Sequence, residues 1–214
     1  MLSGIIASQR PVTVVAPGSG AFLVGETGTS ETFSGSPTLS VPAGTQIGDT
    51  LVAILRCRGD RSFTIPAGWT SRIDSFLGSF DNTRLYVATK VYSGDATETF
   101  TQSTSAACSA SLMAVRGSFI AIDHGGGPTI SLTANASDFL IAVGTNNSVE
   151  SSVPITWTSP LVAVNLYGFL SGSTLFYGLA TASCQVGASG TLNCTYSWTP
   201  FNIESNYSCV MTFR

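Results

Sequence analysis

The side chains that most often carry acid–base chemistry are scarce in this sequence. His124 is the single histidine, and three glycines follow it directly at positions 125–127. A general base has to be held in a fixed geometry, and a run of glycines is a poor mount for one. A Ser-His-Asp triad would have to use His124, and no G-x-S-x-G segment precedes a predicted helix. We therefore interpret His124 as part of a linker and predict no catalytic residue.

The twelve carboxylates are scattered along the chain rather than clustered. A glycosidase needs two carboxyl groups that face each other, and the residues that offer such a pair are Asp60, Asp74, Asp81 and Asp95. Because no spacing among them favours this, a hydrolase of cell-wall or capsular glycan is a disfavoured alternative. The sequence contains no calcium loop of the D-x-D-x-D-G type. It therefore predicts no metal site and no cofactor.

Five cysteines, at positions 57, 108, 184, 194 and 209, form no C-x-x-C pair. Zinc sites need closely spaced ligands, and only one histidine is present to complete one. An odd number of cysteines at wide spacings also argues against a secreted disulfide framework. Cys184 and Cys194 flank a glycine-containing turn and could face each other across a hairpin. We predict five free, mostly buried thiols, which fits synthesis and assembly in a reducing cytoplasm.

The composition is weakly charged and rich in hydroxyl groups. Charged residues make up 10% of the chain, against about 25% in an ordinary soluble domain, whereas 30 Ser and 26 Thr account for 56 of the 214 residues. A net charge of −3 provides no basic field for nucleic acid. No apolar run approaches the roughly 18 residues of a membrane helix, and Met1–Ser8 lacks the features of a signal peptide. Two interpretations stay open: an exposed or secreted β domain, and a subunit whose faces are covered by neighbours in an assembly.

Short runs that alternate in polarity, or are apolar throughout, recur between turn-forming residues. Helical periodicity is not convincing in any window of about 11 residues. The clearest runs span 50–57, 84–92, 109–116, 139–144, 161–170, 174–183 and 206–213. Many short strands at this spacing predict an all-β sandwich or barrel.

The sequence also repeats itself. Five segments return in the same order: Pro37-Thr-Leu-Ser-Val41 as Pro128-Thr-Ile-Ser-Leu132, Asp49-Thr-Leu-Val-Ala as Asp138-Phe-Leu-Ile-Ala, Trp69-Thr-Ser as Trp157-Thr-Ser, Leu85-Tyr-Val-Ala as Leu175-Phe-Tyr-Gly, and Met113-Ala-Val-Arg116 as Met211-Thr-Phe-Arg214. One match would mean little, but five in order indicate two related halves, 37–117 and 128–214. The period of about 90 residues is far longer than a solenoid repeat.

The repeated residues suggest how each half is built. Asp49 and Asp138 stand at turns, where a carboxylate can bond the backbone beyond it, and Trp69 and Trp157 can each bury a large ring. One half would be an open sheet with an uncovered apolar face, so two halves would cover each other. We therefore predict an all-β, jelly-roll-like antiparallel sandwich over residues 37–214 with pseudo-twofold character. The short joint at 123–127 does not exclude two separate domains.

Some residues are candidates for contacts with other molecules. Residues 1–36 lie outside the repeat, and we expect an extended arm that either adds a strand to its own sheet or docks on a neighbour. Arg56, Arg58 and Arg61 are clustered so that they could meet an acidic neighbour. Trp198 has no counterpart in the first half and is our first choice for an exposed aromatic role.

Four segments together resemble a module of tailed-bacteriophage and prophage virion proteins. They are Gly48-Asp49-Thr-Leu-Val-Ala, Ile65-Pro-Ala-Gly-Trp69-Thr, Leu85-Tyr-Val-Ala-Thr-Lys-Val and Ala114-Val-Arg-Gly117. The family runs GD-L-A, PAGW, YKVA and AYRG in the same order, followed by a looser second half. The resemblance covers residues 37–214, and each motif alone is an ordinary strand-and-turn signal. It implies a jelly-roll component of the head exterior, tail or fibre, and it carries over no catalytic motif.

The leading hypothesis is a non-enzymatic virion structural protein that decorates or cements the exterior of a phage head or tail. It would assemble in the host cytoplasm as a homo-oligomer, with capsid or tail subunits as its partners. The alternative is a tail-fibre or spike module that binds host surface polysaccharide through exposed aromatic and polar groups. Neither hypothesis involves nucleic acid, membrane insertion or a cofactor.

Overall fold

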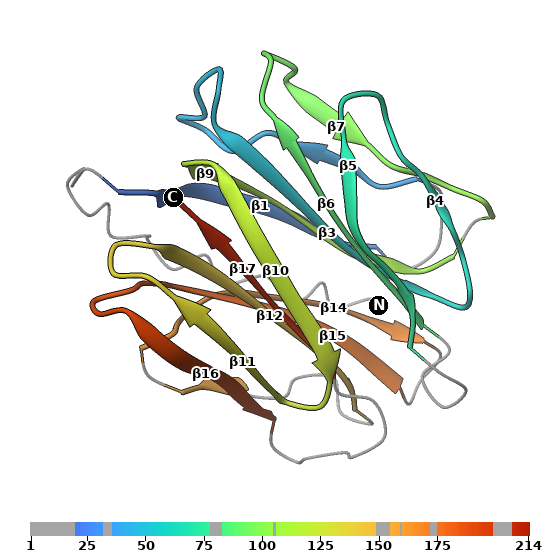
Figure 1. Cartoon of the computed structure of the whole chain (residues 1–214). Coiled ribbons are helices and arrows are strands. Elements are labelled where there is room, and N and C mark those ends of the chain that lie inside the picture. Colours follow the sequence, from blue (N-terminus) through green and yellow to red (C-terminus); the bar gives the residue numbers. More distant parts are fainter. Residues whose placement is uncertain are drawn as a thin grey trace.

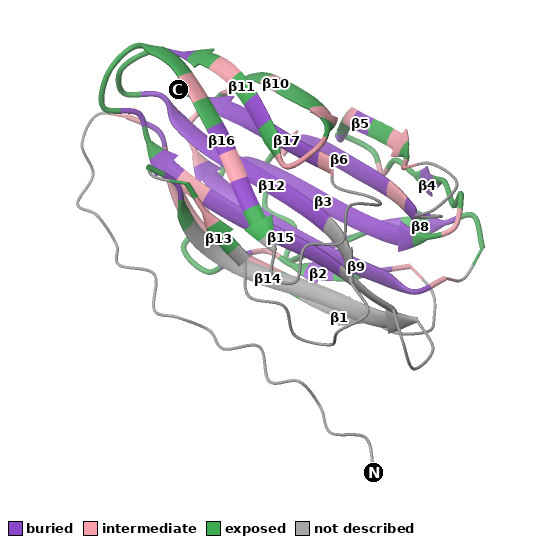
Figure 2. Cartoon of the chain, turned by 90° about the horizontal axis from the view of Figure 1, so that it is seen from below, coloured by how far each residue is buried: buried purple, intermediate pink, exposed green. Residues whose placement is uncertain are grey.

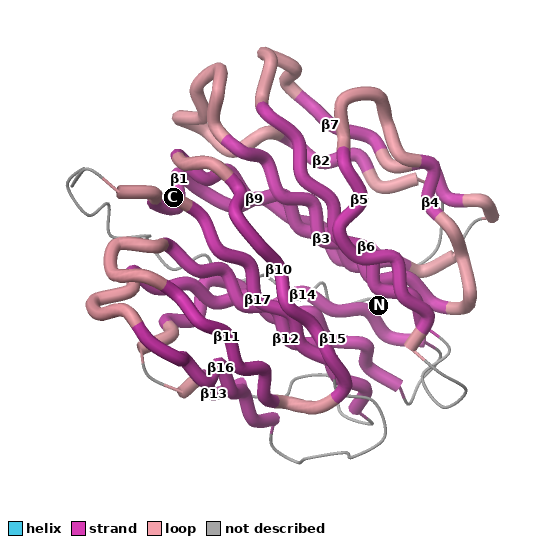
Figure 3. The backbone as a smooth tube through the Cα atoms, viewed as in Figure 1, coloured by secondary structure: helices cyan, strands magenta, loops and turns pink. Residues whose placement is uncertain are grey.

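The computed structural model of the chain describes residues 20–31, 36–77, 83–104, 106–148, 155–158, 160–171, 175–198 and 207–214. Within these ranges every regular element is a β-strand and none is a helix (Figure 3). The all-β prediction is therefore confirmed. The strands follow segments rich in Thr, Val, Leu and aromatic residues, whose side chains fit a pleated surface.

The strands divide into two series along the chain (Figure 1). The first series is β1 (Phe22–Glu31), β2 (Thr38–Ser40), β3 (Thr50–Arg58), β4 (Phe63–Thr64), β5 (Thr70–Phe76), β6 (Thr83–Val91), β7 (Thr97–Thr99), β8 (Thr101–Gln102) and β9 (Cys108–Arg116). The second series is β10 (Phe119–Gly126), β11 (Thr129–Ala134), β12 (Phe139–Ser148), β13 (Ile155–Trp157), β14 (Val162–Ser171), β15 (Leu175–Gln185), β16 (Gly190–Trp198) and β17 (Tyr207–Phe213).

The two series have the same topology. The first large sheet has the order β1-β9-β3-β6-β5, and the second large sheet has the order β10-β17-β12-β15-β14. Smaller layers, β2-β7 with β4-β8 in one half and β11-β16-β13 in the other, also correspond if β7 and β8 together match β16. In each half the first strand pairs with the last, and the second pairs with the next-to-last. This is jelly-roll connectivity, and the chain contains it twice.

Three apolar cores lie in successive layers of the molecule. The central core packs Val52 and Ile54 of the first large sheet against Ile141 and Val143 of the second. The other faces of the two large sheets carry separate outer cores, one beneath the strands β2, β7, β4 and β8 and one beneath β11, β16 and β13. Figure 2 shows β3 and β12, which lie in the middle of the two large sheets, as mainly buried.

The expectation that one half is an open sheet with a single apolar face is wrong. β3 is buried along almost its whole length, because Val52 and Ile54 face the central core while Leu51 and Leu55 face the outer core. A strand with two apolar faces needs a cover on both. Each half supplies its own outer cover and uses the other half as its inner one.

The boundaries of the halves also differ from those that the sequence indicates. β1 pairs antiparallel with β9 at the edge of the first large sheet, so residues 22–31 add a strand to the chain's own sheet; residues 1–19 and 32–35 lie outside the described residues. The joint between the halves is Gly117–Ser118 rather than 123–127, which belong to β10 and its end. Gly117 has a φ of 145°, and a Cβ there would stand 2.4 Å from the Cβ of Ala21. The close approach of the two segments therefore requires glycine at the joint.

The register of the sheets shows which of the five pairs of repeated segments, here called sequence echoes, occupy equivalent positions in the two halves. The segments led by Pro37 and Pro128 are equivalent, since their carbonyls accept hydrogen bonds from Phe100 and Tyr196 at matching positions. The turns at Asp49 and Asp138 and the last strands of the two halves also match.

The tryptophan and leucine echoes are out of register by four residues. Thr50 pairs with Val91 and Phe139 pairs with Gln185, so counting back along β6 and β15 makes Leu85 equivalent to Leu179 rather than Leu175. By the same count Trp69 is equivalent to Leu161 rather than Trp157, because the next residues, Thr70 and Val162, pair with matching positions. Both Trp69 and Leu161 close a turn before an edge strand, which is the position that the fold conserves between its halves.

Candidate functional site: a polar groove at the end of the first sheet

The turn aspartates are joined to the last strand of their own half by a bidentate ion pair. Arg116 donates from Nε and Nη2 to the two carboxylate oxygens of Asp49, at 3.0 and 3.1 Å. Arg214 does the same to Asp138, at 2.8 and 3.1 Å. Each aspartate also accepts from the backbone N–H three residues before it, Gln46 or Asn135. These four charges therefore hold equivalent turns, and they are satisfied within the fold.

The predicted tryptophan anchors lie in different surroundings. Trp69 is buried in the outer core of the first half, packs edge-on against Phe100 and donates from Nε1 to Glu98 at 3.0 Å. Trp157 is half-buried on β13 and packs against Tyr196, and its buried Nε1 has no hydrogen-bond partner among the described residues. The backbone of Trp198 pairs with Ile155 at the end of β16, while its side chain lies outside the described part of the chain.

The predicted arginine cluster is divided by the fold. Arg58 and Arg61 are exposed, as a contact to an acidic neighbour requires. The same expectation for Arg56 is wrong, because it is completely buried. Since side chains alternate along β3, Arg56 shares the inward face of Ile54 and reaches across the central core, where it donates to the carbonyl oxygen of Gly178 at 2.6 Å.

All five cysteines are free and buried, as the sequence predicts. Burial raises the pKa of Cys57 and of Cys184 to about 11 and that of Cys194 to about 12. Because the thiolate is the reactive species, these groups are poor nucleophiles near neutral pH. Cys184 and Cys194 both belong to the outer core of the second half.

The interpretation of His124 as a linker residue is wrong. It lies in β10 opposite Cys209 of β17, and its ring stacks on Tyr207, whose hydroxyl is hydrogen-bonded to Nδ1. The glycines after it do not form a hinge, since Gly125 and Gly126 continue the same strand.

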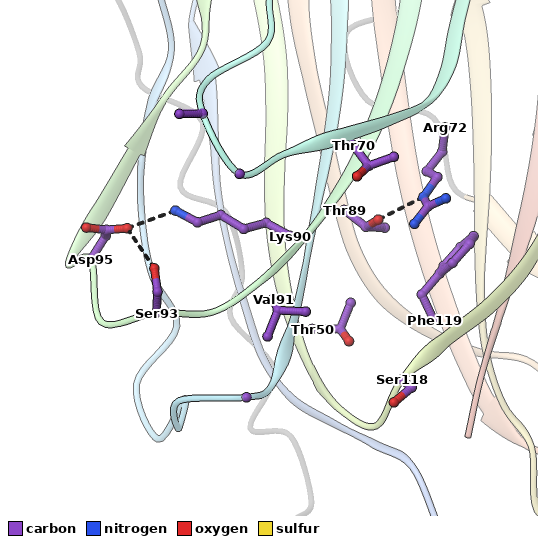
Figure 4. Close-up of a pocket in the computed structure, with 13 residues that line it drawn as sticks. Thr50, Thr70, Arg72, Thr89, Lys90, Val91, Ser93, Asp95, Ser118 and Phe119 are labelled. Atoms are coloured by element: carbon purple, nitrogen blue, oxygen red, sulfur yellow. Dashed lines mark hydrogen bonds and ion pairs between the residues drawn. The ribbon is translucent and has the colours of Figure 1, made fainter.

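A groove of about 690 Å³ crosses the end of the first large sheet, where β5 begins and β6 ends. Ser118 and Phe119, at the start of β10, complete its lining. Figure 4 shows Lys90 and Asp95 at one end of the groove and Arg72 and Phe119 at the other. Hydroxyl groups of Thr50, Thr70, Thr89, Ser93 and Ser118 are distributed between them. Its volume lies in the range of pockets that take small ligands.

Arg72 is held in a defined orientation at one end of this groove. Its Nε donates to Thr89 Oγ1 at 2.8 Å, and its guanidinium carbon lies 4.1 Å from the centre of the Phe119 ring. Phe119 is itself fixed by an edge-on contact with Phe213. Arg72 makes no ion pair with any described residue, and its two terminal nitrogens donate to none of them. The charge is therefore positioned, and no described residue neutralises it.

A buried charged network forms the other end of the groove. Lys90 Nζ donates to Asp95 at 2.8 Å and to Glu98 at 2.7 Å, and Glu98 also accepts from Trp69. The side chains of Lys90 and Glu98 are only 9% and 6% exposed, whereas that of Asp95 is 57% exposed. Desolvation opposes the charge on Lys90, but the two carboxylates outweigh it and raise its pKa.

Sequence reasoning did not single out Lys90, Glu98 or Arg72, and it named Asp95 only as a member of a disfavoured carboxylate pair. Lys90 is the single lysine of the chain, which is the one signal that could have drawn attention to it. Nothing in the sequence links Lys90 to Glu98, because β6 and β7 belong to different sheets and the contact depends on how these sheets pack.

Comparisons with known proteins add no family: no protein-family model, no curated protein and no solved structure matches the chain. In the part of the chain that the structure describes, no group of three or more His, Cys, Asp or Glu side chains is arranged to hold a metal ion. No helix among the described ranges is long and apolar enough to cross a membrane.

Proposed function

We propose that the chain is a non-enzymatic structural protein of a bacteriophage virion, which decorates or cements the exterior of the head or tail. The observation that carries this proposal is how the residues behind the phage-module resemblance are used. Asp49 and Arg116 tie a turn to the last strand, and Trp69 fills an outer core. The residues that resemble the module therefore build the fold itself, and the resemblance supports a structural role.

The charges of the described residues support the same proposal. Arg84 forms ion pairs with both Asp60 and Asp74. The two turn clamps, which are the ion pairs Asp49–Arg116 and Asp138–Arg214, use four further charged groups. A body braced in this way keeps its shape when neighbours pack around it. Arg58 and Arg61 stay exposed on the end of β3 and the loop after it, where they would meet an acidic surface of a capsid or tail subunit. The chain would assemble as a homo-oligomer in the host cytoplasm.

The test is to purify the phage particles that carry the chain on a density gradient and to probe them with an antibody raised against it. We expect the chain to co-sediment in a fixed ratio to the major capsid or tail protein, and gold-labelled antibody to mark the particle exterior. A chain that stays in the soluble fraction, with unlabelled particles, would contradict the proposal. The double variant Arg58→Gln/Arg61→Gln should fold normally but bind particles more weakly.

A second candidate is a tail-fibre or spike module that recognises host surface polysaccharide, and the groove around Arg72 favours it. The two roles separate in one measurement on the purified chain. Saturable binding to host cells supports a receptor-binding module, whereas binding to particles alone supports decoration.

A further inference from the structure

We propose that the groove between Arg72 and Asp95 is a binding site for a carboxylated sugar, a hexuronate unit of an acidic polysaccharide. The proposal does not rest on the virion role, since sugar binding and presence in a particle are measured separately.

Arg72 supplies the recognition of the carboxylate. Its Nε is occupied by Thr89, and its flat face rests on Phe119, so the remaining N–H groups of the guanidinium have a fixed direction. A guanidinium fork matches the two oxygens of a carboxylate, and each charge-assisted hydrogen bond is roughly twice as strong as a neutral one. Because the fork is already ordered, little side-chain entropy is lost on binding.

The fold itself does not need the charged groups of the groove. The second half serves as an internal comparison, because its strands have the same register. There Cys184 and Cys194 take the positions of Lys90 and Glu98. The pairing of β6 with β3 matches that of β15 with β12, and the pairing of β7 with β2 matches that of β16 with β11.

The second half also lacks a charged residue at the position equivalent to Arg72. It stands at the bulge of β5, and the equivalent residue at the bulge of β14 is Val164. A jelly roll of this type therefore forms with thiols and a valine at positions where the first half carries two cations and an anion. The Asp49–Arg116 clamp behaves differently, since it returns as Asp138–Arg214.

The remaining lining selects a sugar rather than an acidic peptide. Thr70 and Ser118 carry side-chain hydroxyls that bond to no described residue, and a hydroxyl can both donate to and accept from the hydroxyls of a sugar ring. Asp95 is exposed at the far end and would repel a second negative charge there. The groove thus favours a ligand with one carboxylate near Arg72 and neutral hydroxyl groups near Asp95.

The experiment uses the full chain and three probes: the methyl glycoside of galacturonate, which carries one carboxylate, the methyl ester of that glycoside, and pentaglutamate. Calorimetry measures affinity at low and high salt, and ¹⁵N NMR follows the Nε–Hε signal of Arg72. We expect the free acid to bind, to shift that signal, and to bind more weakly at high salt. The ester should bind at least about tenfold more weakly, because it cannot form the charged pair.

Matched variants locate the site. Arg72→Gln should weaken binding of the acid by about tenfold to a hundredfold, and Thr70→Val by a smaller factor. Arg58→Gln removes the same charge from the other end of the first sheet and should leave binding unchanged. If Arg72→Gln does not fold, Arg72→Lys tests the same contact. This variant keeps the charge but loses the guanidinium fork, so it should still weaken binding of the acid several-fold.

Three results would overturn the inference. The first is that the unmodified chain does not bind the acid. The second is that it binds the acid and the ester equally well. The third is that the Arg72 and Thr70 variants bind the acid as tightly as the unmodified chain does. Pentaglutamate that binds as tightly as the sugar acid, in competition with it, would make the groove a protein-docking site and would equally refute a sugar site.

Discussion

Replacement of Gly144 by alanine tests whether the second half is a sandwich in its own right. Gly144 lies on β12 beneath the ring of Tyr196, which comes from the covering strand β16. A Cβ added at Gly144 would stand 2.7, 2.8 and 2.9 Å from the Cε1, Cδ1 and Cζ atoms of that ring. Ordinary contacts begin at 3.4 Å, so the ring would have to move by about 0.7 Å.

The ring has little freedom to move. Its hydroxyl shares its one hydrogen between the carbonyl oxygens of Thr145 and Tyr207, at 2.9 and 3.2 Å, and Tyr196 is only 2% exposed. Overpacking of this kind lowers stability by about 1–3 kcal/mol, and a weakened hydrogen bond adds about 1 kcal/mol. Alanine regains about 0.5–1 kcal/mol because it restricts the unfolded chain more than glycine does. The net loss in the free energy of unfolding should be about 1–3.5 kcal/mol.

Urea unfolding followed by tryptophan fluorescence measures this loss. Gly125→Ala is the matched control, because Gly125 also lies in a strand and a Cβ there meets nothing within 4 Å. It should change stability by less than about 1 kcal/mol. In a Tyr196→Ala background the ring is gone, and Gly144→Ala should then cause no further loss. A Gly144→Ala variant as stable as the control, or a loss that persists without the ring, would refute the packing of β16 on the second large sheet.

Ser137 holds a left-handed backbone with a φ of 74°, where the matching turn has Gly48. In urea titrations Ser137→Gly should raise the free energy of unfolding by about 0.5–1 kcal/mol and Gly48→Ser should lower it by about 1 kcal/mol, and two unchanged stabilities would contradict this. Burial raises the pKa of Cys57 to about 11 and that of Cys209 further. Because the folded state disfavours the thiolate, the unfolded chain loses these protons first. These thiols should leave the free energy of unfolding unaffected below about pH 8 and lower it by up to about 1.4 kcal/mol per pH unit and thiol between about pH 9 and 11. A Cys209→Ala variant with the same alkaline slope as the unmodified chain would exclude that thiol as a contributor. Deletion of residues 1–36 removes β1 and should lower the urea midpoint, whereas deletion of the first 19 residues removes no described strand; equal midpoints would show that β1 adds no stability.

The central strands could be predicted from the sequence because their side chains alone specify them. The apolar runs at 50–57 and 109–116 coincide with β3 and β9 to within one residue. In the run 50–57 Leu, Val and Ile fall on both faces, which indicates a strand covered on both sides, whereas the run 109–116 carries Ser109 and Ser111 on one face.

The edge strands β1 and β10 could not be predicted, because their sequences carry little β-propensity of their own. β1 contains Gly25 and Gly28 and resembles a flexible tail, and β10 ends in glycines that resemble a linker. Both strands form by pairing with the last strand of their half, β9 or β17. Tertiary pairing therefore overrides a weak local preference at both edges.

The groove lay beyond sequence reasoning for a related reason. Lys90 and Glu98 belong to different layers of the sandwich, and Arg72 reaches Phe119 only because the two halves pack face to face. Contacts of this kind depend on the whole topology. Only the turn aspartates and the last arginines could be identified in advance, because the repeat presents each of them twice.

The duplication also indicates which polar residues serve the fold and which need another explanation. A feature that appears at equivalent positions in both halves, such as the clamp of Asp49 by Arg116, is explained by the turn that it holds. Lys90 and Glu98 are not repeated, since Cys184 and Cys194 stand in their places and the second half still closes around an apolar core. A buried ion pair adds little stability compared with well-packed apolar groups. The charges kept in the first half alone are therefore better explained by the groove, which Lys90 lines and which Glu98 supports through its ion pair with Lys90, than by the jelly roll that contains them.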